Sequence, residues 1–221
     1  KGTVKKLLQP SQRNTLQSIL KYHVASGKLL AKDVVQRSGA TTLNGQAVAI
    51  TVGDDGVRLD DSKVIKTDIR CSNGVIHVID RVLMPELRNA VELAQSAGKF
   101  GTLLAAAKSA GLAKTLASDG PFTIFAPTDA AFEALPAGTV EQLLQRKNRG
   151  KLQDILKYHV VQGRVSARDL IAAGSGTTLQ GQNVRGSLRN GALFVNDSRV
   201  VANDVQASNA TIHIVDTVLL P

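Results

Sequence analysis

Residues 143–160 read LLQRKNRGKLQDILKYHV, and residues 7–24 read LLQPSQRNTLQSILKYHV. The two stretches align without a gap, and the offset between them, for example from Tyr22 to Tyr158, is 136 positions. Self-similarity at a fixed period is the sequence signature of repeated structural units. A period of this length is the size of a domain and lies well above the roughly 20–45 residues of a solenoid repeat. We therefore expect the chain to contain two copies of one domain.

The closing segment of each copy repeats at the same offset. SNGVIHVIDRVLMP at 72–85 returns as SNATIHIVDTVLLP at 208–221. We place the first copy at 1–85 and the second at 86–221, so that the second copy is complete and the first lacks its opening part. Half a domain would leave apolar surface in water, at a cost of about 25 cal/mol per Å². We therefore expect the parent protein to have further chain upstream of Lys1.

Hydrophobic periodicity predicts helices in the front of the complete copy and strands in its back. Apolar residues recur at helical spacing over 87–116, with breaks near Gly98 and Gly111. Alternation with period two predicts strands at 177–188, 193–195, 199–201 and 211–219, with a hairpin turn at Asn190-Gly191. Because the helices precede the strands instead of alternating with them, the pattern favours an α+β fold.

Three residues have the position and chemistry of helix N-caps. Thr128 precedes a predicted helix over 129–135, and Ser166 precedes another over 167–173. Thr139 begins the sequence Thr-Val-Glu-Gln, which is the pattern of a capping box. We therefore expect each of the three side chains to accept a hydrogen bond from the first turn of its helix.

Composition narrows the classes of partner. The 221 residues carry a net charge of +9, and aromatic residues make up 3% of the chain, with no Trp. A basic protein attracts acidic polysaccharide, anionic lipid or nucleic acid, although a basic surface without a partner is the alternative. Nucleic acid is disfavoured because single-strand binding uses aromatic stacking platforms. No apolar run reaches the roughly 18 residues of a membrane span, and the single cysteine, Cys71, excludes an internal disulfide.

Three segments of the second copy resemble the hallmark segments of fasciclin-like domains. These are GPFTIFAPTDAAF at 120–132, KYHV at 157–160 and ATIHIVDTVLLP at 210–221, and the first copy has KYHV at 21–24 and GVIHVIDRVLMP at 74–85. The resemblance implies an α+β fold in two tandem copies, each a β-sandwich-like wedge with helices packed on one side. It also implies a secreted or cell-surface protein of the extracellular matrix, which acts in cell adhesion and binds a cell-surface receptor or matrix protein.

The resemblance also implies two adhesion motifs. The first is a Tyr-His pair, and the second is an Asp-Ile pair just before the closing segment. In this chain the motif positions are Tyr22, His23, Asp68, Ile69, Tyr158, His159, Asp204 and Val205, so that Val205 departs from the pattern. An exposed Asp can ligate a receptor-bound divalent cation. The alternative is structural, with the Tyr hydroxyl and the His ring bonded internally and the Asp stabilising a turn.

A second kind of candidate site is a local cluster of basic residues, which we call the basic loop. It comprises Arg146, Lys147, Arg149 and Lys151. On a helix–loop–helix these side chains would bind the sulfate or carboxylate groups of an acidic polysaccharide. The alternative is an ordinary solvated loop.

No motif in the chain predicts catalysis, a metal site or a cofactor. The G-x-S-x-G elbow, the P-loop, the G-x-G-x-x-G turn after a strand and the HExxH helix are all missing from the sequence. Each copy offers two histidines, whereas a metal site needs three or four converging ligands. We therefore expect a binding protein and no enzyme. The alternative is a bacterial exported protein of the periplasm or envelope that binds a small ligand or serves as a structural spacer.

Overall fold

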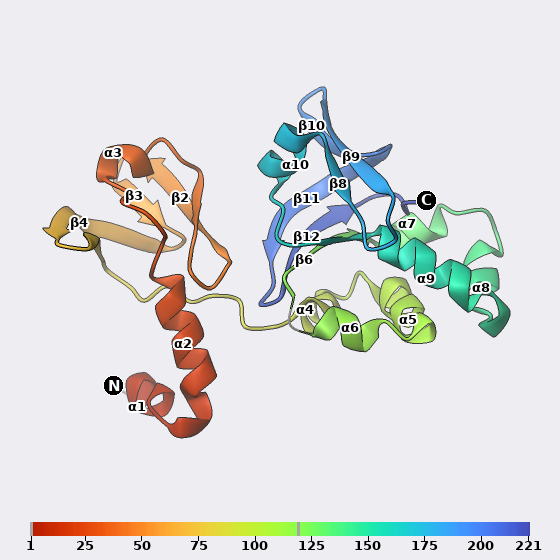
Figure 1. The fold of residues 1–221 in the computed structure, drawn as a ribbon, viewed down its shortest axis with the longest axis horizontal. Helices are drawn as coiled ribbons and strands as arrows, with labels where there is room; N and C mark the ends of the chain where they lie inside the picture. The colour runs from red at the N-terminus through yellow and green to blue at the C-terminus, as the bar shows by residue number, and fades with distance from the viewer. Residues whose placement is uncertain (1, 119) are drawn as a thin grey trace. The chain divides into compact units, whose positions relative to one another are not determined.

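The structure is a computed structural model that describes residues 2–118 and 120–221 (Figure 1). The chain forms two compact units, Lys1–Leu87 and Arg88–Pro221, which we call the first and the second unit. Both combine helices with one antiparallel or mixed sheet, so the protein is an α+β protein with two tandem copies of one fold. Within the described residues, no helix has both the length and the apolar character to cross a membrane.

The second unit opens with helices and then builds a seven-stranded sheet. Its helices are α4 Ala90–Ala97, α5 Gly101–Ala110, α6 Ala113–Ala117, α7 Asp129–Glu133, α8 Thr139–Leu144, α9 Arg149–Tyr158 and α10 Ala167–Ala173. Its strands are β6 Phe122–Pro127, β7 Val160–Gln162, β8 Ser175–Thr177, β9 Asn183–Arg189, β10 Ala192–Val195, β11 Ser198–Gln206 and β12 Ala210–Val215. The strand order is β7-β6-β12-β11-β10-β9-β8, and β6 pairs with β12 in parallel.

Strand β6 lies at the centre of the second unit and is buried along its whole length. Its alternating side chains enter two different cores. Phe125 packs with Tyr158 and Val215, whereas Ile124 packs with Ile212 and other residues beneath α4–α6. A strand that is buried on both faces has a nearly continuous apolar sequence, which accounts for the sequence FTIFAP.

The first unit contains α1 Gly2–Leu7, α2 Arg13–Tyr22, α3 Ala31–Val34, β1 Gly39–Thr41, β2 Ala47–Gly53, β3 Gly56–Leu59, β4 Ser62–Cys71 and β5 Gly74–Ile79. Its strands follow one another in the order β1-β2-β3-β4-β5. Helix α2 and strand β5 match α9 and β12 at the sequence offset of the repeat. Among the described residues β5 pairs with β4 alone, and Ile76 on β5 is 51% exposed, whereas its counterpart Ile212 is 6% exposed.

Most of the predicted helix boundaries are confirmed. Gly98 and Gly111 end α4 and α5 in the left-handed conformation, with φ of 64° and 78°, a conformation that glycine adopts without steric cost. The side chain of Thr128 accepts a hydrogen bond from the Ala131 amide, and that of Ser166 accepts one from the Asp169 amide. Both N-cap predictions are therefore correct.

Three predictions about local structure were wrong. Thr139 is the first residue of α8, and Gly138, at a φ of 80°, occupies the cap position in its place. The single strand predicted over 177–188 is two strands, β8 and β9, because Thr178 and Gln182 close a turn around Gly181. Strand β11 is longer than predicted because two register shifts against β12 interrupt its alternation.

Two polar side chains fix the turn between β11 and β12. Arg164 donates hydrogen bonds to the carbonyl oxygens of Ala207 and Ala210, at 2.7 Å each. Asn209 is 8% exposed and connects the turn to two helices. Its Oδ1 accepts from the amide of Ala90 at 2.9 Å, and its Nδ2 donates to the carbonyl oxygens of Leu116 and Ser118 at 2.9 and 2.7 Å.

Substitution of Asn209 should destabilise the second unit strongly. Asn209→Ala removes three hydrogen bonds and leaves backbone groups of α4 and α6 without their partner, at about 1–3 kcal/mol for each buried group. We expect the free energy of unfolding in urea to fall by about 3 kcal/mol. The control is Asn73→Ala, the exposed counterpart in the first unit, for which we expect a change within about 0.5 kcal/mol. Equal effects of the two substitutions would contradict this account.

Candidate functional site

The two motif tyrosines are buried and hydrogen bonded inside their own units. Tyr158 is 5% exposed; its hydroxyl donates to the carbonyl oxygen of Asn183 at 3.2 Å and accepts from Nδ2 of Asn196 at 2.9 Å. The hydroxyl of Tyr22 donates to Oδ2 of Asp60 at 2.8 Å. Burial, together with this bond, raises the pKa of Tyr22 above its usual range. Each tyrosine thus connects the end of a helix to a strand turn of the same unit.

The histidine of the Tyr-His motif in the second unit is hydrogen bonded through both ring nitrogens. Nδ1 of His159 donates to the carbonyl oxygen of Ile155 at 2.8 Å, and Nε2 accepts from the amide of Leu219 at 2.9 Å. The ring is therefore neutral, since a protonated imidazole would have no lone pair for the Leu219 amide. Burial lowers the pKa of His159 to about 4. His23 makes the corresponding bonds to Ile19 and Leu83, although it is exposed.

The two motif aspartates lie at equivalent bends and cap helices. Asp68 and Asp204 have φ of 58° and 55°. Oδ1 of Asp68 accepts from the amide of Ala31 at 2.9 Å, and Oδ1 of Asp204 accepts from the amide of Ala167 at the same distance. These amides begin α3 and α10, where a carboxylate also interacts favourably with the helix dipole.

The two Asp-Ile motif positions differ in exposure between the units. Asp68 is exposed, Asp204 is half-buried, and both Ile69 and Val205 are half-buried. Val205 packs against the core beneath α4–α6. The motif residues therefore do not converge on one surface. In the second unit Tyr158 connects α9 to the β10–β11 turn, and His159 connects the end of α9 to Leu219. Asp204 connects β11 to the start of α10.

The basic loop begins in a short 3-10 helix, Arg146–Asn148, and continues into the first turn of α9. All four of its cations, Arg146, Lys147, Arg149 and Lys151, are exposed. Nε of Arg149 donates to the carbonyl oxygen of Ala110 at 3.3 Å, at the end of α5. Arg149 thus also fastens two helices together, while its neighbours in the basic loop remain at the surface.

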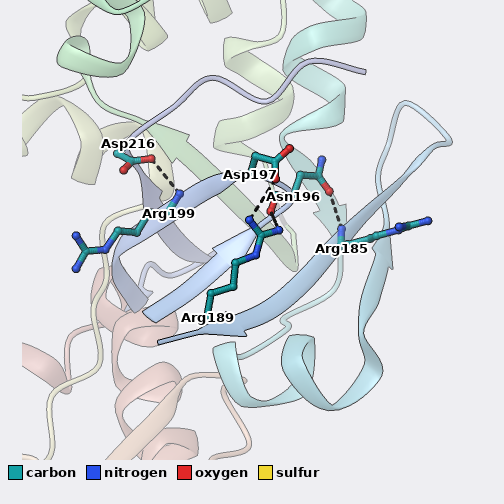
Figure 2. Close-up of polar contacts among 6 residues, drawn as sticks. All are labelled: Arg185, Arg189, Asn196, Asp197, Arg199 and Asp216. Atoms are coloured by element: carbon teal, nitrogen blue, oxygen red, sulfur yellow. Dashed lines mark hydrogen bonds and ion pairs between the residues drawn. The ribbon is translucent and has the colours of Figure 1, made fainter. Parts of the chain in front are cut away.

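A second group of cations, missed in the sequence analysis, lies on the strands β9 and β11. Arg185, Ser187 and Arg189 alternate along β9 and so share one face of the sheet. Ser187 is the register partner of Phe194, and Phe194 is the register partner of Arg199 on β11. Register partners point to the same side, so Arg199 belongs to this face as well. We call the set Arg185, Arg189 and Arg199, with Phe194 and Ser187 between them, the arginine face. Figure 2 shows its three arginines.

Arg189 is the one member of the arginine face whose guanidinium forms an ion pair among the described residues. Its guanidinium lies 3.2 Å from the carboxylate of Asp197 and 4.9 Å from the centre of the Phe194 ring. The Asp197 side chain is 97% exposed, and an ion pair in that position contributes little free energy. The cation–π contact with Phe194 stabilises the position of the guanidinium on this face of the sheet.

Hydrogen bonds fix the backbones of Arg185 and Arg199, and their side chains extend away from these bonds (Figure 2). The amide of Arg185 donates to Oδ1 of Asn196 at 2.8 Å, and the amide of Arg199 donates to Oδ1 of Asp216 at 2.9 Å. Ser187 lies between Arg185 and Arg189 on β9. Its Oγ is the one buried side-chain oxygen or nitrogen in the described part of the chain that has no hydrogen-bond partner. The sequence signal for this face was the alternation of Arg185 and Arg189 within a predicted strand.

The described residues contain no group of three or more His, Cys, Asp or Glu side chains that could hold a metal ion. Cys71, on β4, is exposed and carries a free thiol.

Comparison with known proteins identifies the fold and its relatives. The family model described as the fasciclin domain matches residues 1–85 and 98–221. Protein sll1483 of Synechocystis is 43% identical over 65% of this chain and 79% of its own length. The transforming growth factor-beta-induced protein ig-h3 of Sus scrofa is 32% identical over 93% of this chain, which spans 30% of that protein. A solved structure, a FAS1 domain pair from the insect cell adhesion molecule Fasciclin I, superposes with a TM-score of 0.56 at 20% identity and covers 99% of this chain and 83% of its own.

The buried histidines should make the second unit sensitive to acid. The folded pKa of His159 is about 4, below the ordinary value of 6.5, and burial also lowers the pKa of His213. As the pH falls from 6.5 towards 4, the unfolded chain therefore binds more protons than the folded chain does. The stability that these neutral rings contribute is fully present above pH 6.5 and is lost in this window. For His159 alone the loss amounts to about 3 kcal/mol at pH 4.

Urea unfolding of the wild type at pH 4 to 7.5 measures this loss. We expect His159→Gln to be less stable than the wild type at pH 7.5, because two hydrogen bonds change, and to show a flatter dependence on pH, because the titrating ring is gone. Equal slopes for the wild type and the variant between pH 6.5 and 4 would show that His159 does not cause the acid sensitivity.

Proposed function

Because the chain belongs to the fasciclin domain family, we propose that it is a non-enzymatic adhesion module that attaches to acidic glycans of cell surfaces or of the extracellular matrix. The solved relative is described as part of a cell adhesion molecule, and that description supports adhesion as the class of function. The proposed location is extracellular, either secreted or at the cell surface. A cell-surface receptor or matrix protein that carries such a glycan is the proposed partner.

The observation that carries the glycan proposal is the arginine face. Arginine presents a planar fork of donors that matches sulfate and carboxylate groups in a bidentate manner. Arg185 and Arg189 are four residues apart on β9, or about 13 Å at the usual rise of a strand. A row of cations with that separation suits a polymer with repeated negative charges better than a single small anion. The net charge of +9 adds long-range attraction to such a polymer.

The basic loop supports the same proposal at a second place on the second unit. Arg146, Lys147 and Lys151 are exposed and have no acidic partner within ion-pair distance among the described residues. We propose the arginine face as the primary contact, since its side chains stand on paired strands and one of them is stacked on a ring. Side chains on rigid elements lose less entropy on binding than side chains on a short loop.

We further propose that Asp68 is the motif residue available to a receptor. It is exposed, and one of its carboxylate oxygens accepts the Ala31 amide while the other is outside that bond. An exposed carboxylate oxygen can complete the coordination of a receptor-bound divalent cation. The tyrosine and histidine of the second unit support a receptor less well, because Tyr158 and His159 are 5% and 2% exposed.

Three double charge reversals distinguish a glycan site from a general effect of charge. Arg185→Glu with Arg199→Glu changes the arginine face, and Arg146→Glu with Lys147→Glu changes the basic loop. Lys99→Glu with Lys114→Glu, at exposed positions of the second unit, changes the net charge by the same amount but alters neither the arginine face nor the basic loop. We expect the arginine-face variant to bind immobilised heparin about tenfold more weakly than the Lys99 and Lys114 variant, which corresponds to about 1.4 kcal/mol.

Binding is measured from the dissociation constant at fixed ionic strength, because screening weakens exposed charge pairs. A loss confined to the basic-loop variant would move the site to that loop. Equal losses in all three variants would show that heparin responds to net charge alone and would contradict the proposal.

The receptor proposal is tested with Asp68→Asn. Asparagine keeps an oxygen for the Ala31 amide and tolerates a positive φ, so the fold is kept while the charge is removed. We expect attachment of cells to the immobilised protein to fall by at least half in the presence of divalent cations. We expect no difference between the variant and the wild type once a chelator is present. Asp204→Asn is the matched control, and full attachment by both variants would exclude Asp68 as a receptor contact.

A further inference from the structure

A cavity of about 440 Å³, partly open to solvent, lies in the second unit between the helices α4–α6 and the sheet. Its volume falls within the range of roughly 300–1,000 Å³ that is typical of small-molecule sites. None of the residues of the arginine face or of the basic loop lines it. The cavity is therefore separate from the surfaces that the proposed adhesion function uses.

The walls of the cavity are apolar on both sides. The sheet contributes side chains from four strands, including Ile124 on β6, Val160 on β7, Val205 on β11 and Ile212 on β12. Among the described residues that line the cavity, Gln95 and Lys108 alone have polar side chains. The backbone groups of β6 and β12 are paired with each other and with their neighbours in the sheet. An occupant would thus meet apolar side chains with few hydrogen-bonding groups.

The composition of the helices explains why the space is not filled. Six of the helix residues that line the cavity are alanines, namely Ala90, Ala94, Ala97, Ala105, Ala107 and Ala113. A methyl group on each turn of a helix cannot fill the space between two layers, whereas protein interiors are normally packed as densely as organic crystals. Side chains that face a void lose dispersion contacts on that side. An apolar occupant would restore these contacts.

Hydrogen bonds at one end hold the cavity open. Asn209 bonds the first amide of α4, at Ala90, and the carbonyl oxygens of Leu116 and Ser118 at the end of α6. These bonds fasten α4 and α6, which both line the cavity, to the β11–β12 turn. The walls are therefore positioned before a ligand arrives, as is usual for small-molecule sites.

We propose that this cavity is a binding site for an uncharged, largely hydrocarbon small molecule. A charged ligand is disfavoured because burial of an unpaired charge is costly and Lys108 is the one charged side chain among the described residues that line the cavity. A peptide is disfavoured because its backbone groups would lack partners against walls whose own backbone groups are already paired. The second unit then combines an adhesive surface with a carrier site for an apolar molecule.

The neutral fluorescent probe N-phenyl-1-naphthylamine, whose emission rises in apolar surroundings, tests this site in the complete 221-residue chain. Ala94→Phe places an aromatic ring in the cavity from α4, and Ala172→Phe places the same ring on an exposed position of α10. The matched control is needed because apolar side chains such as Ile76 and Ile65 of the first unit are exposed and could also enhance the probe's emission.

We expect the wild type and Ala172→Phe to bind the probe saturably with the same dissociation constant, and Ala94→Phe to bind at least tenfold more weakly. Excess probe should raise the melting temperature of the wild type and of the control, since a ligand that binds the folded state stabilises it. Ala113→Leu fills the cavity from α6 and replaces Ala94→Phe if that variant does not fold. Undiminished binding by a folded cavity-filling variant, or no saturable binding by the wild type, would overturn the proposal.

Discussion

The parallel pairing of β6 with β12 is the constraint on which the rest of the second unit depends. Both strands are buried almost throughout, and their opposite faces belong to two separate cores. One core holds Phe125 and the ring of Tyr158, and it supports the strands that carry the arginine face. The other lies beneath α4–α6 and contains the cavity. A change in the register of this pair would exchange the side chains of the two cores, so the surface and the cavity depend on the same strand pairing.

The sequence motifs that identify the family mainly connect one element of the fold to another. His159 joins the end of α9 to Leu219, and Asp204 joins β11 to the start of α10. A buried polar group must be bonded, or its burial costs several kcal/mol, which explains why these residue types occupy these positions. In the second unit the proposed glycan contact therefore lies outside the motifs, on the arginines of β9 and β11, which have the exposure and the fixed backbone that binding of an acidic polymer requires.

Much of the fold could be predicted from sequence, because local rules determine it. The repeat offset located the counterparts of α9 and β12, glycine located the ends of α4 and α5, and Thr128 and Ser166 capped their helices as expected. Apart from the cap of α8 and the turn between β8 and β9, the failures were those of long-range geometry. The bulges of β11 depend on its pairing with β12. The arginine face depends on a register between strands that no single segment encodes, and the cavity depends on alanines of three helices that meet only in the folded unit.

Glycan binding at the arginine face is tested most directly by NMR on the isotope-labelled chain, with a short heparin oligosaccharide as the ligand. We expect the shift changes to concentrate on β9, β10 and β11 around Arg185, Phe194 and Arg199, and to weaken as salt is added. Changes confined to residues 146–151, or spread evenly over the exposed lysines and arginines of both units, would contradict this expectation.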